Sequence, residues 1–172
     1  MGELLIRKAT PIRKATPDDL PALTDIYNHY VRTTPITFDI EPRTLGQRRE
    51  WLSQFSDRGR YQCFVAVEDG APIGWACSAM FKEKAAYETS IETSVYCAPG
   101  QTGKGLGRHL YNTLFDALKG EDIHRAYAGV TLPNEASVAL HEALGFKLMG
   151  TYHEPGRKFG KFWDVAIFER AM

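Results

Sequence analysis

The sequence has no excess of charge of either sign, few cysteines and no long apolar run. Its 172 residues include 21 Lys and Arg against 21 Asp and Glu. Proteins that bind nucleic acid or anionic membranes favour a basic surplus, so charge supports neither class. No apolar stretch approaches the roughly 20 residues of a membrane-spanning helix, and the opening MGELLIRKATP lacks the apolar core of a signal peptide. We expect neither nucleic acid nor membrane as a partner.

Disulfides and metal sites also find little support. The cysteines, Cys63, Cys77 and Cys97, are widely spaced among apolar residues and form no CxxC pair. An odd number of buried thiols is typical of a reduced, cytoplasmic protein. The histidines lack the spacing of metal ligands, which predicts that no metal is needed.

The hexapeptide IRKATP occurs twice in tandem near the start, at Ile6–Pro11 and Ile12–Pro17. Repeat architectures need longer units and several of them, so this duplication predicts none. Only the second copy leads into TPDDL, which is typical of a helix start with Thr16 as N-cap. We expect residues 1–11 to be a disordered or added extension and residues 12–172 to form the domain. A lengthened first strand is the alternative.

Hydrophobic periodicity predicts one α/β domain with a mixed sheet. No linker or low-complexity segment interrupts the order β-α-α-β-β-β-α-β-α-β-β. The strands are predicted within Leu4–Ala15 and at Tyr61–Glu68, Pro72–Phe81, Tyr87–Cys97, Ala126–Leu132, Phe146–Tyr152 and Phe162–Glu169. The helices are predicted at Asp18–Val31, Thr44–Phe55, Leu106–Leu118 and Asn134–Leu144.

Glycines crowd one short stretch, GQTGKGLGRHL at Gly100–Leu110, directly before a predicted helix. A P-loop requires Ser or Thr after its Gly-Lys pair, but Gly105 follows Lys104 here. A dinucleotide fingerprint requires a third glycine where Arg108 or Leu110 stands, and it belongs near the first strand. A run of backbone N–H groups before a helix suits a pyrophosphate without a metal. A glycine-rich turn without a ligand is the alternative.

The segment SVYCAPGQTGKGLGRHLYNTLF resembles motif A of the Gcn5-related N-acetyltransferases (GNAT), whose pattern is [QR]-x-x-G-x-[GA] after a strand ending in Pro. In that family the loop holds the pyrophosphate of acetyl-coenzyme A (acetyl-CoA), which the resemblance implies here as co-substrate. Thr102 stands where the family usually has Gln or Arg, with Gln101 one position earlier. The resemblance also implies that the preceding strand splays from its neighbour and pairs with the pantetheine arm. The implied coenzyme-binding residues are Ser94, Val95, Tyr96, Cys97, Thr102, Gly103, Lys104, Gly105, Leu106, Gly107, Arg108, Asn134 and Ser137.

Further segments extend the resemblance over the chain from about Ile12 to the C-terminus. NEASVALHEALGF resembles a later helix of the family, N-x-x-[AS]-x-x-L-Y-x-x-x-G-F. ITFDIEP, FKEKAAYETSIETSVY and GRKFGKFWDV resemble the branch that acetylates phosphinothricin and methionine sulfoximine. The resemblance implies a single-domain α/β fold, with a mixed, mostly antiparallel sheet flanked by helices, and a homodimer.

Acyl transfer from a thioester to an amine needs a base, because an alkyl amine is mostly protonated at neutral pH. Glu92 lies in an otherwise uncharged strand, SIETS, where partial burial would raise its pKa, and it matches the branch's base. His141 stands where the wider family usually carries Tyr and this branch carries His. The resemblance implies that His141 protonates the leaving thiolate or supports the base. An exposed strand glutamate and a structural histidine are the alternatives.

A substrate pocket is implied by the match to the same branch. Two cations beside an aromatic wall fit an amino acid with a carboxylate and a compact polar head. The branch often has Arg where Lys84 stands, and Lys cannot form the same bidentate fork. A solvated turn with surface lysines is the alternative. The implied substrate residues are Phe38, Phe81, Lys82, Lys84, Tyr87 and Thr93.

The main functional hypothesis is acetyl-CoA-dependent acetylation of the α-amino group of a small amino acid analogue. A rival keeps the chemistry but acts on a peptide or protein N-terminus or on another amine. Lys82 and Lys84 argue against a polyamine, which would need an acidic pocket. A third hypothesis is a coenzyme-binding sensor without turnover, against which the presence of both Glu92 and His141 argues.

Overall fold

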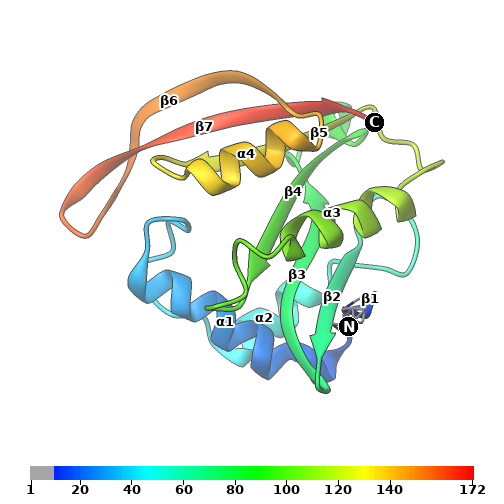
Figure 1. Cartoon of the computed structure of the whole chain (residues 1–172). Coiled ribbons are helices and arrows are strands. Elements are labelled where there is room, and N and C mark those ends of the chain that lie inside the picture. The colour runs from blue at the N-terminus through cyan, green and yellow to red at the C-terminus, as the bar shows by residue number, and fades with distance from the viewer. Residues whose placement is uncertain (1–9) are drawn as a thin grey trace, which may run out of the picture.

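Seven strands form one sheet in the order β1-β2-β3-β4-β5-β7-β6 in the computed structural model, which describes residues 10–172 (Figure 1). Only the central pair, β4 and β5, is parallel, and every other neighbouring pair is antiparallel. The predicted mixed, mostly antiparallel sheet is therefore confirmed. The strands are β1 Ile12–Lys14, β2 Cys63–Glu68, β3 Ala71–Met80, β4 Ser90–Cys97, β5 Arg125–Thr131, β6 Lys147–Lys158 and β7 Lys161–Ala171.

Two hydrophobic clusters pack helices against the sheet. Leu23 of α1 and Trp51 of α2 pack with Trp75 of β3 in one cluster. In the other, the buried leucines of α3 recur at helical spacing and pack with Ala76, the neighbour of Trp75 on β3. Because alternate strand residues face opposite sides, the two clusters cover the two faces of the sheet. The helices are α1 Leu20–Thr33, α2 Leu45–Leu52, α3 Leu106–Ala117 and α4 Glu135–Ala143.

Two predicted strand boundaries were wrong. β4 begins at Ser90 rather than at Tyr87, because Ala85–Tyr87 forms a short 3-10 turn. β6 runs to Lys158 rather than ending at Tyr152, since antiparallel pairing with β7 outweighs the turn-like composition of HEPGRK. The result is a long β6–β7 hairpin, closed by Phe159 and Gly160 at φ of 52° and 73°.

The second IRKATP copy supplies the first described strand. β1 pairs with β2, and the carbonyl of Pro11 accepts a hydrogen bond from the Val67 N–H at 2.9 Å. The first copy, apart from Thr10 and Pro11, lies outside the described residues.

Deleting residues 2–9 is expected to leave both stability and kcat nearly unchanged, because β1 and the Pro11–Val67 hydrogen bond remain. The melting temperature should fall by no more than a few degrees, as measured by thermal denaturation beside a kcat assay. A loss of ten degrees or so, which corresponds to more than about 2 kcal/mol in a domain of this size, would show that the deleted segment packs on the domain.

Candidate active site

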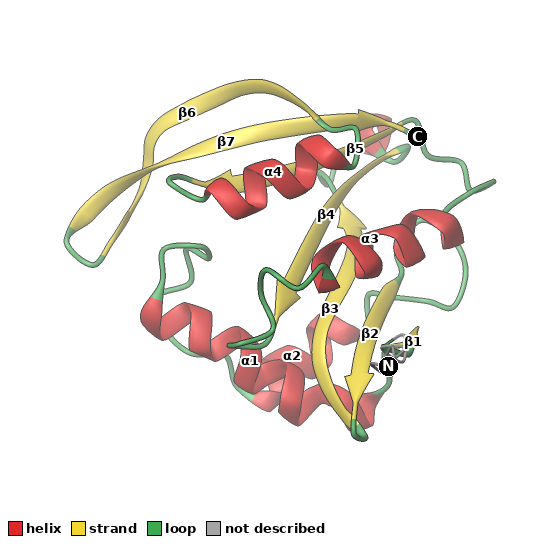
Figure 2. Cartoon of the chain, viewed as in Figure 1, coloured by secondary structure: helices red, strands yellow, loops and turns green. Residues whose placement is uncertain are grey.

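β4 and β5 part from one another immediately after Glu92. Their parallel pairing is limited to three positions, of which Glu92 opposite Tyr127 is the last. Beyond that point β4 pairs with β3 alone and β5 with β7 alone, and Figure 2 shows the two strands diverging. The centre of the sheet therefore opens into a wedge with a free strand edge on each side.

The backbone of β4 presents Val95 to this wedge. The Ala98 N–H donates to the Ile73 carbonyl of β3, at 2.8 Å. Hydrogen-bonding groups alternate along an antiparallel ladder, so the N–H and C=O of Val95 and Cys97 point away from β3 and toward the wedge. The Cys97 carbonyl already accepts a hydrogen bond from the Tyr30 hydroxyl at 2.6 Å, which leaves a ligand only its second lone pair. Val95 is the better placed of the two.

A cavity of about 80 Å³ lies in the wedge and brings together several predicted residues. It joins both predicted catalytic residues with residues of β4, β5, α3 and α4, so segments distant in sequence meet here. The cavity is lined by Ile36, Glu92, Thr93, Ser94, Val95, Tyr96, Tyr111, Gly129, Val130, Thr131, Asn134, Ser137 and His141.

Glu92 stands at the apex of the wedge, opposite Ala79 on β3 and Tyr127 on β5. Its side chain is open to solvent, but the protein atoms around it raise the pKa of its carboxyl through desolvation. No ion pair to Glu92 is found among residues 10–172. A carboxylate with a raised pKa and no cation to neutralise it is a better proton acceptor than an ordinary glutamate.

His141 is buried on α4, and both of its ring nitrogens contact protein groups. Nδ1 lies 2.7 Å from the Ser137 carbonyl, which can only accept, so Nδ1 carries the proton. Nε2 then accepts from the Tyr111 hydroxyl at 3.3 Å. Burial lowers the pKa of His141, and the hydrogen bond to Ser137 opposes this only in part, so the ring is neutral near pH 7.

Tyr111 is a site residue that the sequence reasoning missed. It follows Leu110 on α3 and is fully buried, and burial raises the pKa of its hydroxyl. In the sequence it falls within an apolar helical stripe, where an aromatic residue is typical of a core position. Only the fold shows that its hydroxyl reaches His141 of another helix.

The glycine-rich loop leaves backbone N–H groups without partners at the start of α3. Gly105 is the N-cap at φ 82° and has no side chain to cap the helix. The first intrahelical bond is donated by the His109 N–H, so those of Leu106, Gly107 and Arg108 have no intrahelical acceptor. This is the arrangement that binds phosphate groups at helix N-termini.

The loop lies next to the wedge. A Cβ added to Gly107 would come within 3.1 Å of Leu140 of α4 and 3.8 Å of Val95 of β4. The remaining predicted loop residues, Thr102, Gly103 and Lys104, are exposed, and Gln101 is turned away to donate to Glu68 at 3.0 Å. Gln101 therefore does not take the place of the Gln or Arg that the motif usually has at the position of Thr102.

Asn134 and Ser137 border the cavity at the start of α4. The Asn134 Oδ1 accepts from the Ser137 N–H at 3.1 Å and so caps the helix. The Ser137 hydroxyl lies 3.4 Å from the His141 Nδ1, and both Asn134 and Ser137 line the cavity. The predicted coenzyme residues on β4 lie on two faces of the strand. Tyr96 stacks on Trp75, with ring centroids 4.9 Å apart, while Val95 packs on the other face, with the cluster that contains α3.

Three of the predicted substrate residues form one cluster beside Glu92. Phe81 stacks on Tyr127, the strand neighbour of Glu92, with ring centroids 4.4 Å apart. The Lys82 Nζ lies 4.9 Å from the Phe81 ring and 5.0 Å from the Tyr87 ring. The cluster therefore places a cation beside an aromatic wall.

The other three predicted substrate residues are not part of this cluster. Thr93 lines the cavity beside Glu92; it is buried, and its hydroxyl donates to the Tyr127 carbonyl at 3.3 Å, bridging β4 and β5 where they part. Phe38 lies against Gly156 of the β6–β7 hairpin. Lys84 is exposed at the start of the 3-10 turn.

Residues 23–146 match the model of the GNAT acetyltransferase family. The chain belongs to this family. It is 53% identical over 163 residues to a phosphinothricin N-acetyltransferase of Streptomyces coelicolor, covering 94% of this chain and 95% of that protein. Two solved structures are also similar: a phosphinothricin acetyltransferase of Sinorhizobium meliloti in complex with acetyl-CoA (TM-score 0.90, 30% identity, 96% and 89% covered) and a ribosomal-protein-alanine N-acetyltransferase of Brucella melitensis (TM-score 0.88, 33% identity, 94% and 99% covered).

The described part of this acetyltransferase contains no helix long and apolar enough to span a bilayer. Within residues 10–172, no three His, Cys, Asp or Glu side chains gather as a metal site would require. Cys63 and Cys77 are buried, Cys97 is half-buried, and all three are free thiols.

Proposed function

We propose that the chain transfers the acetyl group of acetyl-CoA to the α-amino group of a small amino acid analogue of the phosphinothricin or methionine sulfoximine type. One observation carries this proposal: Glu92, with its raised pKa, stands at the apex of the β4–β5 wedge, between the free N–H groups of the glycine-rich loop and the Phe81–Lys82–Tyr87 cluster. A base, a coenzyme cradle and an amino acid pocket thus meet at one point.

The co-substrate is bound mainly by backbone. Loop residues 102–108 surround the pyrophosphate with N–H groups, and the exposed side chains of Lys104 and Arg108 add positive charge. The free edge of β4 at Ser94–Cys97 receives the pantetheine arm, with Asn134 and Ser137 on the facing helix. These assignments need no metal, because no step requires a further cation.

Glu92 acts as the base. Its carboxylate accepts a proton from the substrate ammonium, directly or through a water, and the neutral amine attacks the thioester carbonyl. The Val95 N–H donates to the oxyanion that forms, and such a donor is worth about 100-fold or more in kcat. The attack forms the C–N bond. When the tetrahedral intermediate collapses, the carbonyl is restored and the C–S bond breaks, and the second proton of the nitrogen reaches the thiolate through water, which leaves the amide and free coenzyme A.

His141 supports this reaction rather than donating the proton itself. Both of its nitrogens are occupied, Nδ1 by Ser137 and Nε2 by Tyr111, so neither faces a ligand. Its role is to orient the Tyr111 hydroxyl at the cavity wall. The raised pKa of Tyr111 makes it a weak acid, so its oxygen orders the water that protonates the thiolate.

The acceptor binds at the Phe81–Lys82–Tyr87 cluster. The Lys82 ammonium pairs with the carboxylate, and the Phe81 and Tyr87 rings, which meet edge to face, cover the compact side chain. A peptide N-terminus is the second candidate, favoured by the likeness to the ribosomal-protein-alanine acetyltransferase structure. Its first residue offers no free carboxylate to Lys82, which is why we prefer the free amino acid. The homodimer implied by the family resemblance stays a prediction.

A panel of acceptors tests the proposal. Thiol release from acetyl-CoA should be measured in EDTA with phosphinothricin, methionine sulfoximine and methionine sulfone, beside an alanine-starting peptide and spermidine. We expect the highest kcat/KM with one of the three analogues, and a loss of at least about tenfold when its carboxylate is amidated, since a charge-assisted hydrogen bond is lost. A higher kcat/KM for the peptide would establish the rival function, and loss of activity in EDTA would contradict a metal-free site.

A further inference from the structure

The loop that follows α1, residues 34–39, reaches the active-site cavity through one side chain. Ile36 lines the same cavity as Glu92 and His141. It is the first residue of the ITFDIEP segment, in which only Phe38 was predicted as a site residue. Its neighbours on the loop, Thr37 and Phe38, do not contact the cavity. They contact the β6–β7 hairpin instead.

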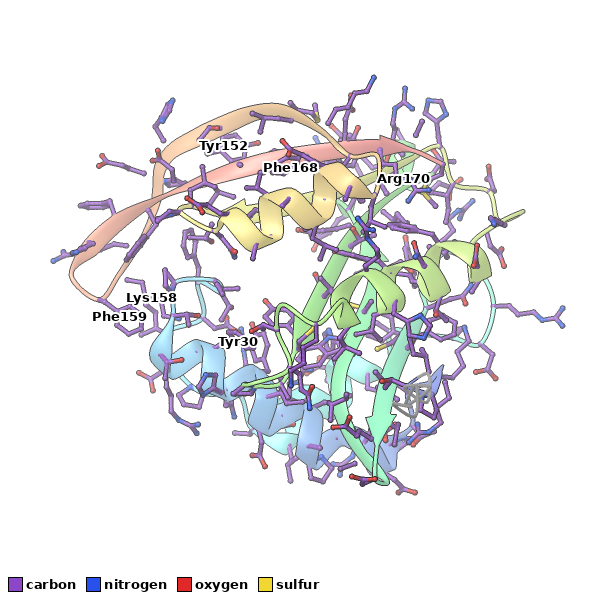
Figure 3. The ribbon with its side chains drawn as sticks, in the orientation of Figure 1. Tyr30, Tyr152, Lys158, Phe159, Phe168 and Arg170 are labelled. Carbon is purple, nitrogen blue, oxygen red and sulfur yellow. The ribbon has the colours of Figure 1, made fainter. Side chains whose placement is uncertain are left out.

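Lys158 at the end of β6 makes the first of these contacts. Figure 3 labels Lys158 near the closed end of the β6–β7 hairpin. Its ammonium is buried and donates to the Thr37 carbonyl at 2.7 Å, across 121 positions of sequence. The Trp163 indole N–H donates to the Lys158 carbonyl at 2.9 Å and so fixes the backbone at this point. Burying an ammonium is costly unless it is hydrogen-bonded, so this contact strongly favours one position of the loop.

Gly156 makes the second contact. A Cβ at this position would lie 2.2, 2.5 and 2.8 Å from three atoms of the Phe38 ring, so the ring packs directly on the glycine backbone. Gly156 follows an irregularity in the pairing of β6 with β7, between Tyr152 and Gly156. The other two glycines of the hairpin, Gly150 and Gly160, have nothing within 4 Å of a Cβ, so Gly156 alone of the three meets a ring.

The base of the loop is fixed independently by α1 and the segment before α2. The Tyr27 hydroxyl lies 2.8 Å from the Thr37 Oγ1 and donates to Asp39 at 2.7 Å. Arg43 binds the same carboxylate through two nitrogens, at 2.7 and 2.5 Å. The loop is thus held from one side at Thr37 and Asp39, and from the other by the hairpin contacts at Thr37 and Phe38, the two residues after Ile36.

We propose that Lys158 and Gly156 are positioning residues for acetyl transfer: they clamp the 34–39 loop so that Ile36 forms a wall of the cavity beside Glu92, where the amine meets the thioester. The inference rests on the proposed function for the identity of that site. The hairpin thus shapes the reacting centre from outside, while the glycine-rich loop that binds the pyrophosphate is independent of it.

The chain offers matched controls on the same strand. Gly156→Ala forces the Phe38 ring to move, whereas a Cβ at Gly150 meets nothing within 4 Å. We expect Gly156→Ala to raise KM for the acceptor by about 10-fold or more, because small misplacements of a substrate wall have large kinetic effects. Gly150→Ala should leave KM unchanged, and both variants should keep the wild-type Kd for acetyl-CoA. Equal KM values in the two variants would overturn the proposal.

A second pair tests the lysine. Lys158→Met removes the ammonium and leaves the Thr37 carbonyl unpaired, while Lys161→Met changes an exposed lysine on the facing strand. Amide hydrogen exchange over residues 34–44 should become faster in Lys158→Met and in Gly156→Ala only. This readout does not depend on turnover, so it tests the clamp even if no amino acid analogue is acetylated. Unchanged exchange in both variants would refute the clamp.

A Phe38→Ala background shows whether Gly156→Ala acts through the Phe38 ring or through general damage to the fold. In a Phe38→Ala background the ring is absent, so adding Gly156→Ala should have no further effect on KM or on exchange. If Gly156→Ala costs as much without the ring as with it, the glycine acts through some other contact and the proposal is wrong.

Discussion

Replacing Glu92 with glutamine is expected to lower kcat by about 100-fold or more near neutral pH, the usual size of a general-base effect. The amide keeps the shape of the side chain but cannot accept the ammonium proton. Kd for acetyl-CoA should hardly change, because the free N–H groups of the loop belong to residues 106–108, far along the chain from Glu92. Steady-state kinetics and calorimetry together measure both quantities.

The pH dependence separates loss of a base from general damage. As pH rises toward the pKa of the amine, more substrate arrives neutral, and the deficit of Glu92→Gln should shrink. A deficit that is constant across pH would show that Glu92 has another role. If Glu92→Gln keeps the wild-type kcat near neutral pH, another residue is the base.

A lower stability of the folded protein should not explain the lower kcat of Glu92→Gln. Desolvation raises the pKa of Glu92 in the folded state, so the folded protein binds this proton more tightly than the unfolded chain does. The carboxyl therefore favours folding at pH values below its unfolded pKa, and this contribution is lost as pH rises through the folded pKa. At neutral pH the charged form is the unfavourable one, and Glu92→Gln should melt at the wild-type temperature or slightly above it.

His141→Ala is expected to cost less than Glu92→Gln, because both of its nitrogens contact protein groups and water can protonate the thiolate. Tyr111→Phe should then resemble His141→Ala in kcat, since the pair acts as one unit. A His141→Ala deficit as large as that of Glu92→Gln would instead support direct proton transfer by the imidazole.

Sequence reasoning succeeded where a feature depends on local chemistry. The glycine-rich loop, the start of α3 and the carboxylate on β4 are each encoded within about ten consecutive residues, where glycine, a helix pattern and a lone carboxylate have local meaning. The start of α3 at Leu106 and the raised pKa of Glu92 are as the residues predicted, while the role of Glu92 as base stays a prediction.

Contacts between distant segments could not be predicted in the same way. The Tyr111–His141 hydrogen bond joins two helices, and the Lys158–Thr37 bond joins a loop to a hairpin, so neither leaves a local pattern. The length of β6 was missed for a related reason. The glycine and proline of HEPGRK favour a turn, and only pairing with β7 holds them in a strand.

Gly105→Val is expected to abolish measurable binding of acetyl-CoA. Gly105 is the left-handed N-cap of α3 at φ 82°, where a β-branched residue is strained and its bulk occupies the space in which the free N–H groups meet the pyrophosphate. The space around its Cβ position is open in the protein itself, with nothing within 4 Å, so the side chain clashes with the ligand and not with the fold.

Gly120→Val is the matched control for this variant. Gly120 has nearly the same backbone, at φ 86°, and also has nothing within 4 Å of a Cβ, but it lies in the turn that follows α3, at the end away from the glycine-rich loop. Both variants should lose a similar stability, about 1–2 kcal/mol for a left-handed non-glycine residue. Only Gly105→Val should lose the calorimetric signal of acetyl-CoA. If both variants bind alike, the loop is a turn without a ligand, and the coenzyme must be held mainly by the open edge of β4.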